Sequence, residues 1–180
     1  MNPEKRKKPF DDAEPEIRRL ATFLNAFYKE SDRGAVLMAA SILDEVLLSM
    51  IKSFLTETPE SSKLTEGFNA PLGTFSSRIL AAYALGLIEK CEYQEVEAIR
   101  QIRNFFGHNW DGIDFEHPKV KGQIQKLPFG EETPRHRLNN TVANLLGDWL
   151  WRERLVKKER RNFKEWTHKG GFGRKLPERD

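Results

Sequence analysis

The sequence predicts an all-α protein, folded as a single bundle of five or six helices with basic, flexible termini. Apolar residues recur every three or four positions along several long segments, as they do on the buried face of a helix. These segments are bounded by proline, glycine and capping residues, and no alternating strand pattern of useful length appears. At 180 residues, with 38% hydrophobic and 32% charged side chains, the chain can bury a core without disulfides or metals.

The first part of the chain predicts two long helices. In residues 14–29, Pro15 is suited to a first helical turn, and the apolar side chains repeat at helical spacing: Ile17, Leu20, Leu24 and Phe27. Asp32 is the expected N-cap of the second and longest helix, whose broad apolar stripe reaches Phe54. Such breadth predicts burial against more than one neighbour. Its acidic interruption at residues 44–45 argues against a membrane span.

Shorter elements are expected between residues 58 and 88. Residues 58–62 break the chain, and Ser61 or Ser62 could cap a short helical turn that extends to Leu64. Residues 67–73 predict a tight loop. Thr74 can then cap a helix that ends at Gly86, because glycine readily leaves the helical conformation.

The second half predicts a central helix over residues 89–108 and a C-terminal helix from about residue 134. Three prolines and three glycines make residues 109–137 irregular, although residues 117–127 could hold a short helix. The last helix keeps its apolar register as far as Val156. Leu150 and Trp151 point away from that register, so this helix should be sandwiched or should meet a partner chain.

Charge divides the chain into three segments. Residues 1–13 predict a flexible basic N-terminus, residues 14–156 the helical domain, and residues 157–180 a basic helix end and tail. Although the net charge is +3, residues 11–156 hold 17 basic and 22 acidic side chains. Because the basic surplus lies at the ends, the folded body offers no general surface for nucleic acid, and weak non-specific DNA binding is the most we expect.

The central helix carries the most suggestive chemistry. On a helical wheel Arg103 falls inside the apolar arc, Gly107 favours a turn out of the helix, and His108 follows at the negative end of the helix dipole. A catalytic interpretation makes His108 a general acid or base and gives Arg103 a phosphate to hold, with Asn104 in support. A structural interpretation has the arginine reaching solvent and the histidine capping carbonyl groups.

The remaining candidates are weaker. His117, His136 and His168 lack the spacing of metal ligands, and no metal and no cofactor are expected. A basic, aromatic segment could contact nucleic acid or a protein partner, or simply be solvated: Arg160, Arg161, Lys164 and Trp166. Cys91 is the single cysteine, and no signal peptide is evident. Both features favour a cytoplasmic location.

Three stretches resemble the mannitol operon repressor family: DRGAVLMAASILD (32–44), FNAPLGTFSSRILAAYALGLI (68–88) and IRQIRNFFGH (99–108). The resemblance implies an all-helical transcriptional regulator that has no DNA-reading motif and acts through a protein partner. Its candidate binding residues are Asp32, Arg33, Asn69 and Arg78. Gly107 departs from the pattern, where alanine is expected, and the basic C-terminal segment lies outside the resemblance.

The run RNFFGH (103–108) also resembles the signature of HEPN domains, in which an arginine, a polar residue, a few further residues and a histidine follow one another. This second resemblance implies a metal-independent ribonuclease, with RNA as substrate and with Arg103 and His108 in a cleft shared by two subunits. The two resemblances are compatible, since a regulator can keep a HEPN-like scaffold.

The sequence therefore predicts first a non-enzymatic regulator that works by protein contacts, and second a ribonuclease. Both interpretations predict a homodimer. The homodimer is predicted because the C-terminal helix is apolar on more than one side, through Trp149, Leu150 and Trp151. Exposed apolar patches usually mark interfaces. The end of the central helix should lie near the symmetry axis.

Overall fold

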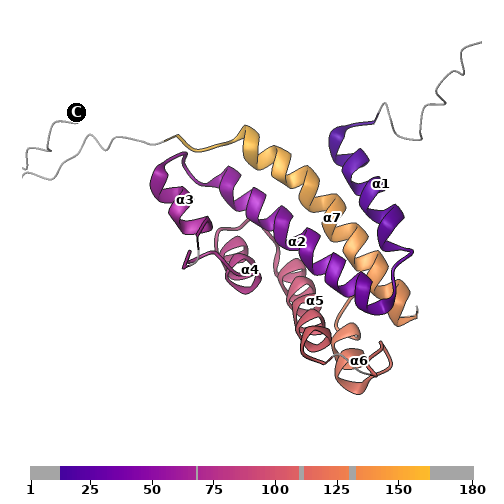
Figure 1. Ribbon diagram of the computed structural model, residues 1–180. Helices are drawn as coiled ribbons and strands as arrows, with labels where there is room; N and C mark the ends of the chain where they lie inside the picture. Colours follow the sequence, from indigo (N-terminus) through magenta and orange to yellow (C-terminus); the bar gives the residue numbers. More distant parts are fainter. Residues whose placement is uncertain (1–12, 68, 110–111, 130–132, 163–180) are drawn as a thin grey trace, which may run out of the picture.

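The computed structural model describes residues 13–67, 69–109, 112–129 and 133–162. Within these residues the chain forms helices and no strand (Figure 1): α1 (Pro15–Phe27), α2 (Asp32–Phe54), α3 (Pro59–Thr65), α4 (Phe75–Ala84), α5 (Lys90–His108), α6 (Pro118–Ile124) and α7 (Pro134–Lys158). The all-α prediction is confirmed, but seven helices exceed the expected five or six. The sequence indicated only a helical turn at α3 and left α6 open, because seven residues carry too little periodicity.

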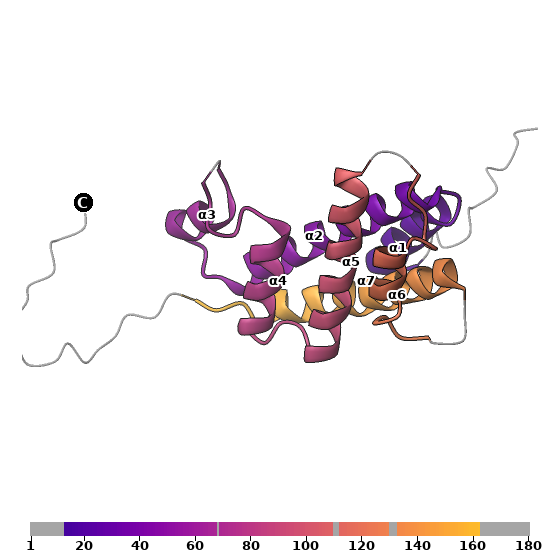
Figure 2. The same ribbon diagram turned by 90° about the horizontal axis from the view of Figure 1, so that it is seen from below.

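Helix α2 is the element around which the bundle is built. It contacts α7 on one side and both α4 and α5 on another, and it lies in the middle of the bundle (Figures 1 and 2). Helix α1 lies against α7 and α2, while α6 contacts α5 and α7. By length and hydropathy α2 would suffice to cross a membrane, a test that buried core helices also pass. Half of its most apolar window is buried inside the bundle.

Residues with hydroxyl side chains cap the N-termini of both α2 and α3. Each cap lies one or more residues before the cap that the sequence predicted. Ser31 caps α2, since its Oγ accepts a hydrogen bond from the N–H of Gly34 at 3.1 Å. The predicted cap, Asp32, is the first helical residue instead. Thr58 caps α3 by accepting from the N–H of Ser61 at 3.2 Å, so neither predicted serine does so. Where polar residues are adjacent in sequence, only the backbone geometry decides which one precedes the helix.

Helix α7 is covered on more sides than its sequence suggested. Trp149 is fully buried and Leu150 nearly so, because α2 lies on one side of α7 and α1 on another. Trp151 is 50% exposed and Leu155 47% exposed. The expectation that a single bundle cannot cover Trp149 and Leu150 is therefore wrong, and only the outer face of α7 keeps exposed apolar side chains.

A carboxylate is buried where α5 meets α7. Glu92 accepts hydrogen bonds from Trp149 Nε1 at 3.1 Å and from Arg152 Nη1 at 2.6 Å. It also accepts from the backbone N–H of Glu89, the N-cap residue of α5, at 2.6 Å. Glu95 lies close to this group, and its pKa is raised, first by burial and then by the negative charges of Glu92 and Asp148.

We expect Glu95→Gln to stabilise the protein at neutral pH and to lose that effect in acid. A carboxyl with a raised folded-state pKa favours folding below its unfolded pKa, ordinarily 4.5. That contribution disappears as the pH rises through the folded-state pKa, because the charged form is penalised. Thermal unfolding of both proteins at several pH values measures the difference. A stabilisation that grows toward acid pH would contradict the expectation.

Candidate functional site

Three separate stretches of the chain line one groove of about 390 Å³ between α2, α4 and α5. They contribute Ala40, Ser41 and Asp44 from α2, Thr74, Phe75 and Ser76 from the start of α4, and Arg100, Arg103 and Asn104 from α5. These residues fall within the stretches 32–44, 68–88 and 99–108, the same three that resemble one family. Because the fold brings all three together at this place, the groove is the candidate functional site.

The groove follows from the unequal lengths of two neighbouring helices. The 10 residues of α4 and the 19 of α5 correspond to about 15 Å and about 28 Å of helix. The two helices are joined by a short turn that includes Gly86, whose φ of 70° suits glycine. Helix α4 therefore begins beside the middle of α5, and α5 continues well past it (Figure 2). Beyond the start of α4, the side of α5 is left open.

Arg103 and Asn104 lie in this open part. Arg103 Nη1 donates a hydrogen bond to Asn104 Oδ1 at 3.1 Å. Arg103 is exposed and Asn104 half-buried, so the placement of Arg103 on a buried face is corrected. The helical wheel places Arg103 on the same side of α5 as its apolar residues. That side is open at Arg103, because α4 does not extend far enough along α5 to cover it.

His108 is the last residue of α5 and is exposed. The expected turn at Gly107 does not occur, because the helix continues through Gly107 to His108, and Asn109 is its C-cap. Arg33 binds the end of α5 instead: its Nη1 donates to the carbonyl of Phe106 and its Nη2 to that of Asn109, each at 2.6 Å. His108 is not among the residues that line the groove, so the fold does not place it beside Arg103 there.

Arg100 enters the groove already paired with an acid. It donates two hydrogen bonds to Glu97, from Nε at 2.7 Å and from Nη2 at 2.6 Å. The hydrogen bond from Arg100 lowers the pKa of Glu97, and the same hydrogen bond raises the pKa of Arg100. This pair lies one turn before Arg103 on α5, so the two arginines have different electrostatic surroundings.

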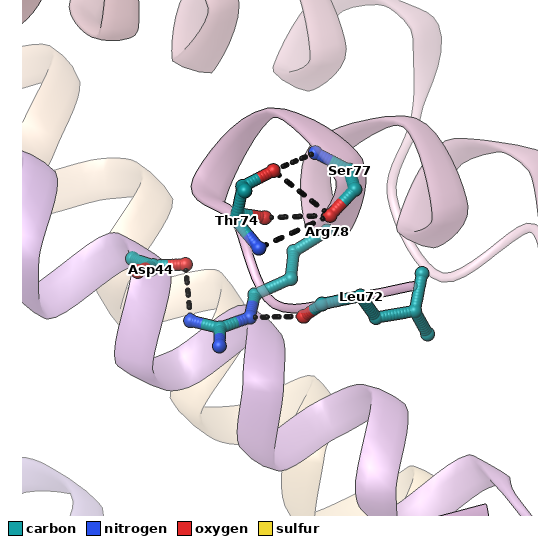
Figure 3. Close-up of polar contacts among 5 residues, drawn as sticks. All are labelled: Asp44, Leu72, Thr74, Ser77 and Arg78. Carbon is teal, nitrogen blue, oxygen red and sulfur yellow. Dashed lines mark hydrogen bonds and ion pairs between the residues drawn. The ribbon is translucent and has the colours of Figure 1, made fainter. Parts of the chain in front are cut away.

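Arg78 ties the start of α4 to α2 (Figure 3). Its Nη1 donates to Asp44 Oδ1 at 2.8 Å, and its Nε donates to the carbonyl of Leu72 at 2.9 Å. Thr74 and Ser77 form the predicted cap of α4 as a reciprocal capping box. Arg78 was predicted to bind a partner; in the structure its side chain holds Asp44 and the first turn of α4 in place beside the groove.

The other predicted binding residues lie apart from the groove. Asp32 is 3.2 Å from Arg135 of α7, in an ion pair that joins the beginnings of α2 and α7. Arg33 holds the end of α5, and its guanidinium also lies 5.7 Å from the ring centre of Phe106. Asn69 is exposed in the turn before α4. Asp32 and Arg33 therefore connect helices, and the groove does not include Asn69.

The basic C-terminal segment begins against the end of α2. Arg160 Nη1 lies 3.3 Å from Glu57 Oε2, and the guanidinium of Arg161 lies 4.5 Å from the ring centre of Phe54. Lys164 and Trp166 lie outside the described residues, as do His168 and the rest of the tail. The first basic residues of this segment thus contact the bundle itself.

The histidines in the described part of the chain serve local structure or face solvent. His117 is the N-cap of α6, and its Nδ1 accepts from the N–H of Lys119 at 3.3 Å. Its ring also packs on Phe105, with ring centres 4.8 Å apart. His136 is exposed. Among the described residues no group of three or more His, Cys, Asp or Glu side chains could hold a metal ion.

Sequence reasoning missed several lining residues of the groove, namely Ser41, Asp44, Ser76 and Arg100. From the sequence, Asp44 was interpreted only as an interruption of an apolar stretch, and Thr74 only as a helix cap. A polar residue within the apolar stripe of α2 was the available signal, because buried stripes admit a charge only where it is paired or faces an opening.

Comparisons with known proteins give one family match and one match of fold. A sequence model described as "Mannitol repressor" matches residues 29–162, a range that includes all three stretches. The X-ray structure of the MtlR–HPr complex from Escherichia coli contains a similar chain, with a TM-score of 0.57 and 19% identity over 80% of this chain and 99% of that one. At this identity the likeness concerns the fold. No curated protein sequence matches significantly. Because the family match spans most of its length, the chain belongs to the mannitol repressor family.

Proposed function

We propose that the protein is a non-enzymatic transcriptional regulator of the mannitol repressor type, which acts in the cytoplasm through protein–protein contacts. The observation that carries this proposal is the convergence of the three family-like stretches on one groove within residues 29–162. A groove lined by several polar side chains and flanked by exposed helix faces suits a polypeptide partner.

The first partner to test is an HPr protein. The similar chain of known structure was solved in a complex with HPr, and we propose a partner of that kind for this chain. The sequence carries no recognisable helix-turn-helix, and two basic residues of the C-terminal segment already contact the bundle, Arg161 at Phe54 of α2 and Arg160 at Glu57 just after it. We therefore propose that any contact with DNA is weak and comes from the basic ends.

Calorimetry with the full chain can distinguish binding to a protein partner from binding to DNA. We expect saturable binding to purified HPr from the same organism, and weak DNA binding that disappears as salt is raised. A scrambled duplex of the same length is the control for operator DNA. Tight, operator-specific binding by a monodisperse sample, together with no specific protein partner in a pull-down, would overturn the proposal.

The regulator proposal also predicts the outcome of a ribonuclease test. We expect neither the wild type nor His108→Ala to cleave RNA in EDTA, because His108 lies outside the groove that holds Arg103. A general base must come within hydrogen-bonding reach of the proton it removes. RNA cleavage by the wild type that leaves cyclic phosphate ends and is lost in His108→Ala would establish the HEPN-type alternative instead.

The homodimer is a further prediction, and Trp151 rather than Trp149 is the residue of α7 that can test it. Trp149→Glu would place a charge in the core, since Trp149 is fully buried. Trp151→Glu changes the exposed face of α7, and Arg103→Glu changes the end of α5. We expect light scattering to give the mass of a dimer at micromolar concentration and of a monomer for at least one variant. A monomeric wild type would disprove the prediction.

A further inference from the structure

Among the described residues, one cation of the groove has no acid to neutralise it. Arg100 is paired with Glu97, and Asp44 with Arg78, at distances between 2.6 and 2.8 Å. Arg103 has only the amide oxygen of Asn104 as a hydrogen-bond partner within the described residues. The charges around the groove therefore leave a surplus of one positive charge, and that charge is on Arg103.

This surplus stands out against the charge of the whole domain. Residues 11–156 hold more acidic than basic side chains, 22 against 17. A ligand of negative charge is repelled by most of such a body and attracted where an unneutralised guanidinium is exposed. Electrostatic complementarity of this kind sets where and in which orientation a partner docks.

The neighbouring side chains add hydrogen-bonding groups of the right kind. Because the Oδ1 atom of Asn104 accepts from Arg103, its amide N–H groups remain available to an acceptor. Ser41 and Ser76 are exposed on the two other walls of the groove, on α2 and α4. Their hydroxyl groups can donate as well. Donors from three helices therefore border the space beside Arg103.

We propose that this groove receives an aspartate or glutamate side chain from the partner protein, with its carboxylate on the guanidinium of Arg103. The inference deepens the proposed function and rests on it. Arginine binds carboxylates through two parallel hydrogen bonds, which fix orientation as well as charge. One unneutralised guanidinium balances a single negative charge, whereas a doubly charged phosphoryl group would leave one negative charge without a partner. The charge of the groove therefore favours a carboxylate over a phosphoryl group.

A site-resolved titration tests the chemistry of the groove without any particular partner. The probe is an acetylated peptide of alternating glutamate and glycine, followed through the backbone amide signals of the full chain by NMR. We expect saturable shifts at residues 41, 76 and 104, weakened about tenfold in Arg103→Gln. Resolving individual residues separates the groove from the basic tails, which will also attract an acidic peptide.

Arg18→Gln provides the matched control. Arg18 is an exposed arginine on α1, outside the groove, and its loss should leave the groove titration unchanged. The lysine–glycine version of the peptide should produce no shift in the groove. The inference fails if the glutamate peptide shifts only the amide signals of the basic tails. It also fails if the shifts of the groove signals are the same in Arg103→Gln as in the wild type. A peptide with phosphoserine in place of glutamate that binds more tightly would overturn the choice of carboxylate.

Binding to HPr distinguishes this inference from the proposed function. If HPr binds, we expect Arg103→Gln to raise its Kd about tenfold and Arg103→Lys to restore part of the affinity. Unchanged affinity in Arg103→Gln would refute the role of Arg103 while the proposed function stands. If neither HPr nor any other protein binds, the proposed function fails, whatever the peptide titration gives.

Discussion

Replacing Trp149 by alanine is expected to lower the free energy of unfolding by about 3 to 5 kcal/mol, the usual effect of removing a buried tryptophan. Trp149 of α7 is fully buried in the hydrophobic core and is among its largest side chains. The substitution leaves a cavity that rigid helices can close only in part. It also removes the indole N–H from Glu92, whose carboxylate is almost without contact to solvent.

Trp151→Ala is the matched control for this prediction. It makes the same chemical change two residues later on the same helix, at a side chain that is 50% exposed. We expect a loss of no more than about 1 kcal/mol, because about half of the removed surface is already in contact with water and no closed cavity is left. Urea unfolding followed by circular dichroism measures both variants. Equal losses would mean that α7 is not oriented as described.

Replacing Arg78 by alanine should have the next largest effect, and we expect it to lower the free energy of unfolding by about 2 to 3 kcal/mol. The side chain of Arg78 is only 12% exposed, and that of Asp44 28%. Removing one partner of such a pair leaves a poorly solvated charge on the other. The carbonyl of Leu72 also loses its hydrogen bond from Arg78 Nε. Urea unfolding of the variant and the wild type gives the difference.

Two further variants test whether position or charge explains the effect. Arg19→Ala breaks an ion pair of the same length, 2.8 Å, between side chains that are 37% and 67% exposed. We expect it to cost less than about 1 kcal/mol, as exposed pairs do. Arg78→Lys keeps the charge but cannot hold Asp44 and the Leu72 carbonyl with one planar group, so it should recover only part of the stability.

Arg78→Ala should also alter the groove. Its loss frees the first turn of α4, which carries Thr74, Phe75 and Ser76 on one wall. A partner that docks there should bind more weakly, although Arg78 itself does not line the groove. An unchanged affinity in a variant that is measurably less stable would show that the wall does not need Arg78 to hold its shape.

Much of the helical architecture could be predicted from the sequence. Periodic apolar residues placed the long helices to within a few residues, and Thr74 was recognised as the cap of α4. Both signals are local, because helix periodicity and capping depend on residues within one or two turns. The caps of α2 and α3 were misplaced for the same reason: adjacent polar residues compete, and local pattern does not rank them.

In the central helix α5, local sequence pattern identified two polar residues of the groove but not their surroundings in the fold. Its polar residues Arg103 and Asn104 were recognised from the sequence, and both line the groove. The burial of Arg103 and its proximity to His108 were expected as well. The first expectation was wrong because burial depends on how far the neighbouring helix extends. The second is not supported at the groove, because α5 continues through Gly107.

The sequence by itself thus determined the all-α class, the long helices, the charge of each segment and the family-like stretches. Only the tertiary structure decided that Trp149 is core and Trp151 surface, that Arg78 positions α4, and that Arg103 is the cation left without an acid in the described groove. These outcomes depend on contacts between residues far apart in the sequence, such as Asp44 with Arg78, 34 positions apart, and Glu92 with Trp149, 57 positions apart. Helix periodicity specifies the direction of each side chain, but not what the folded chain places opposite it.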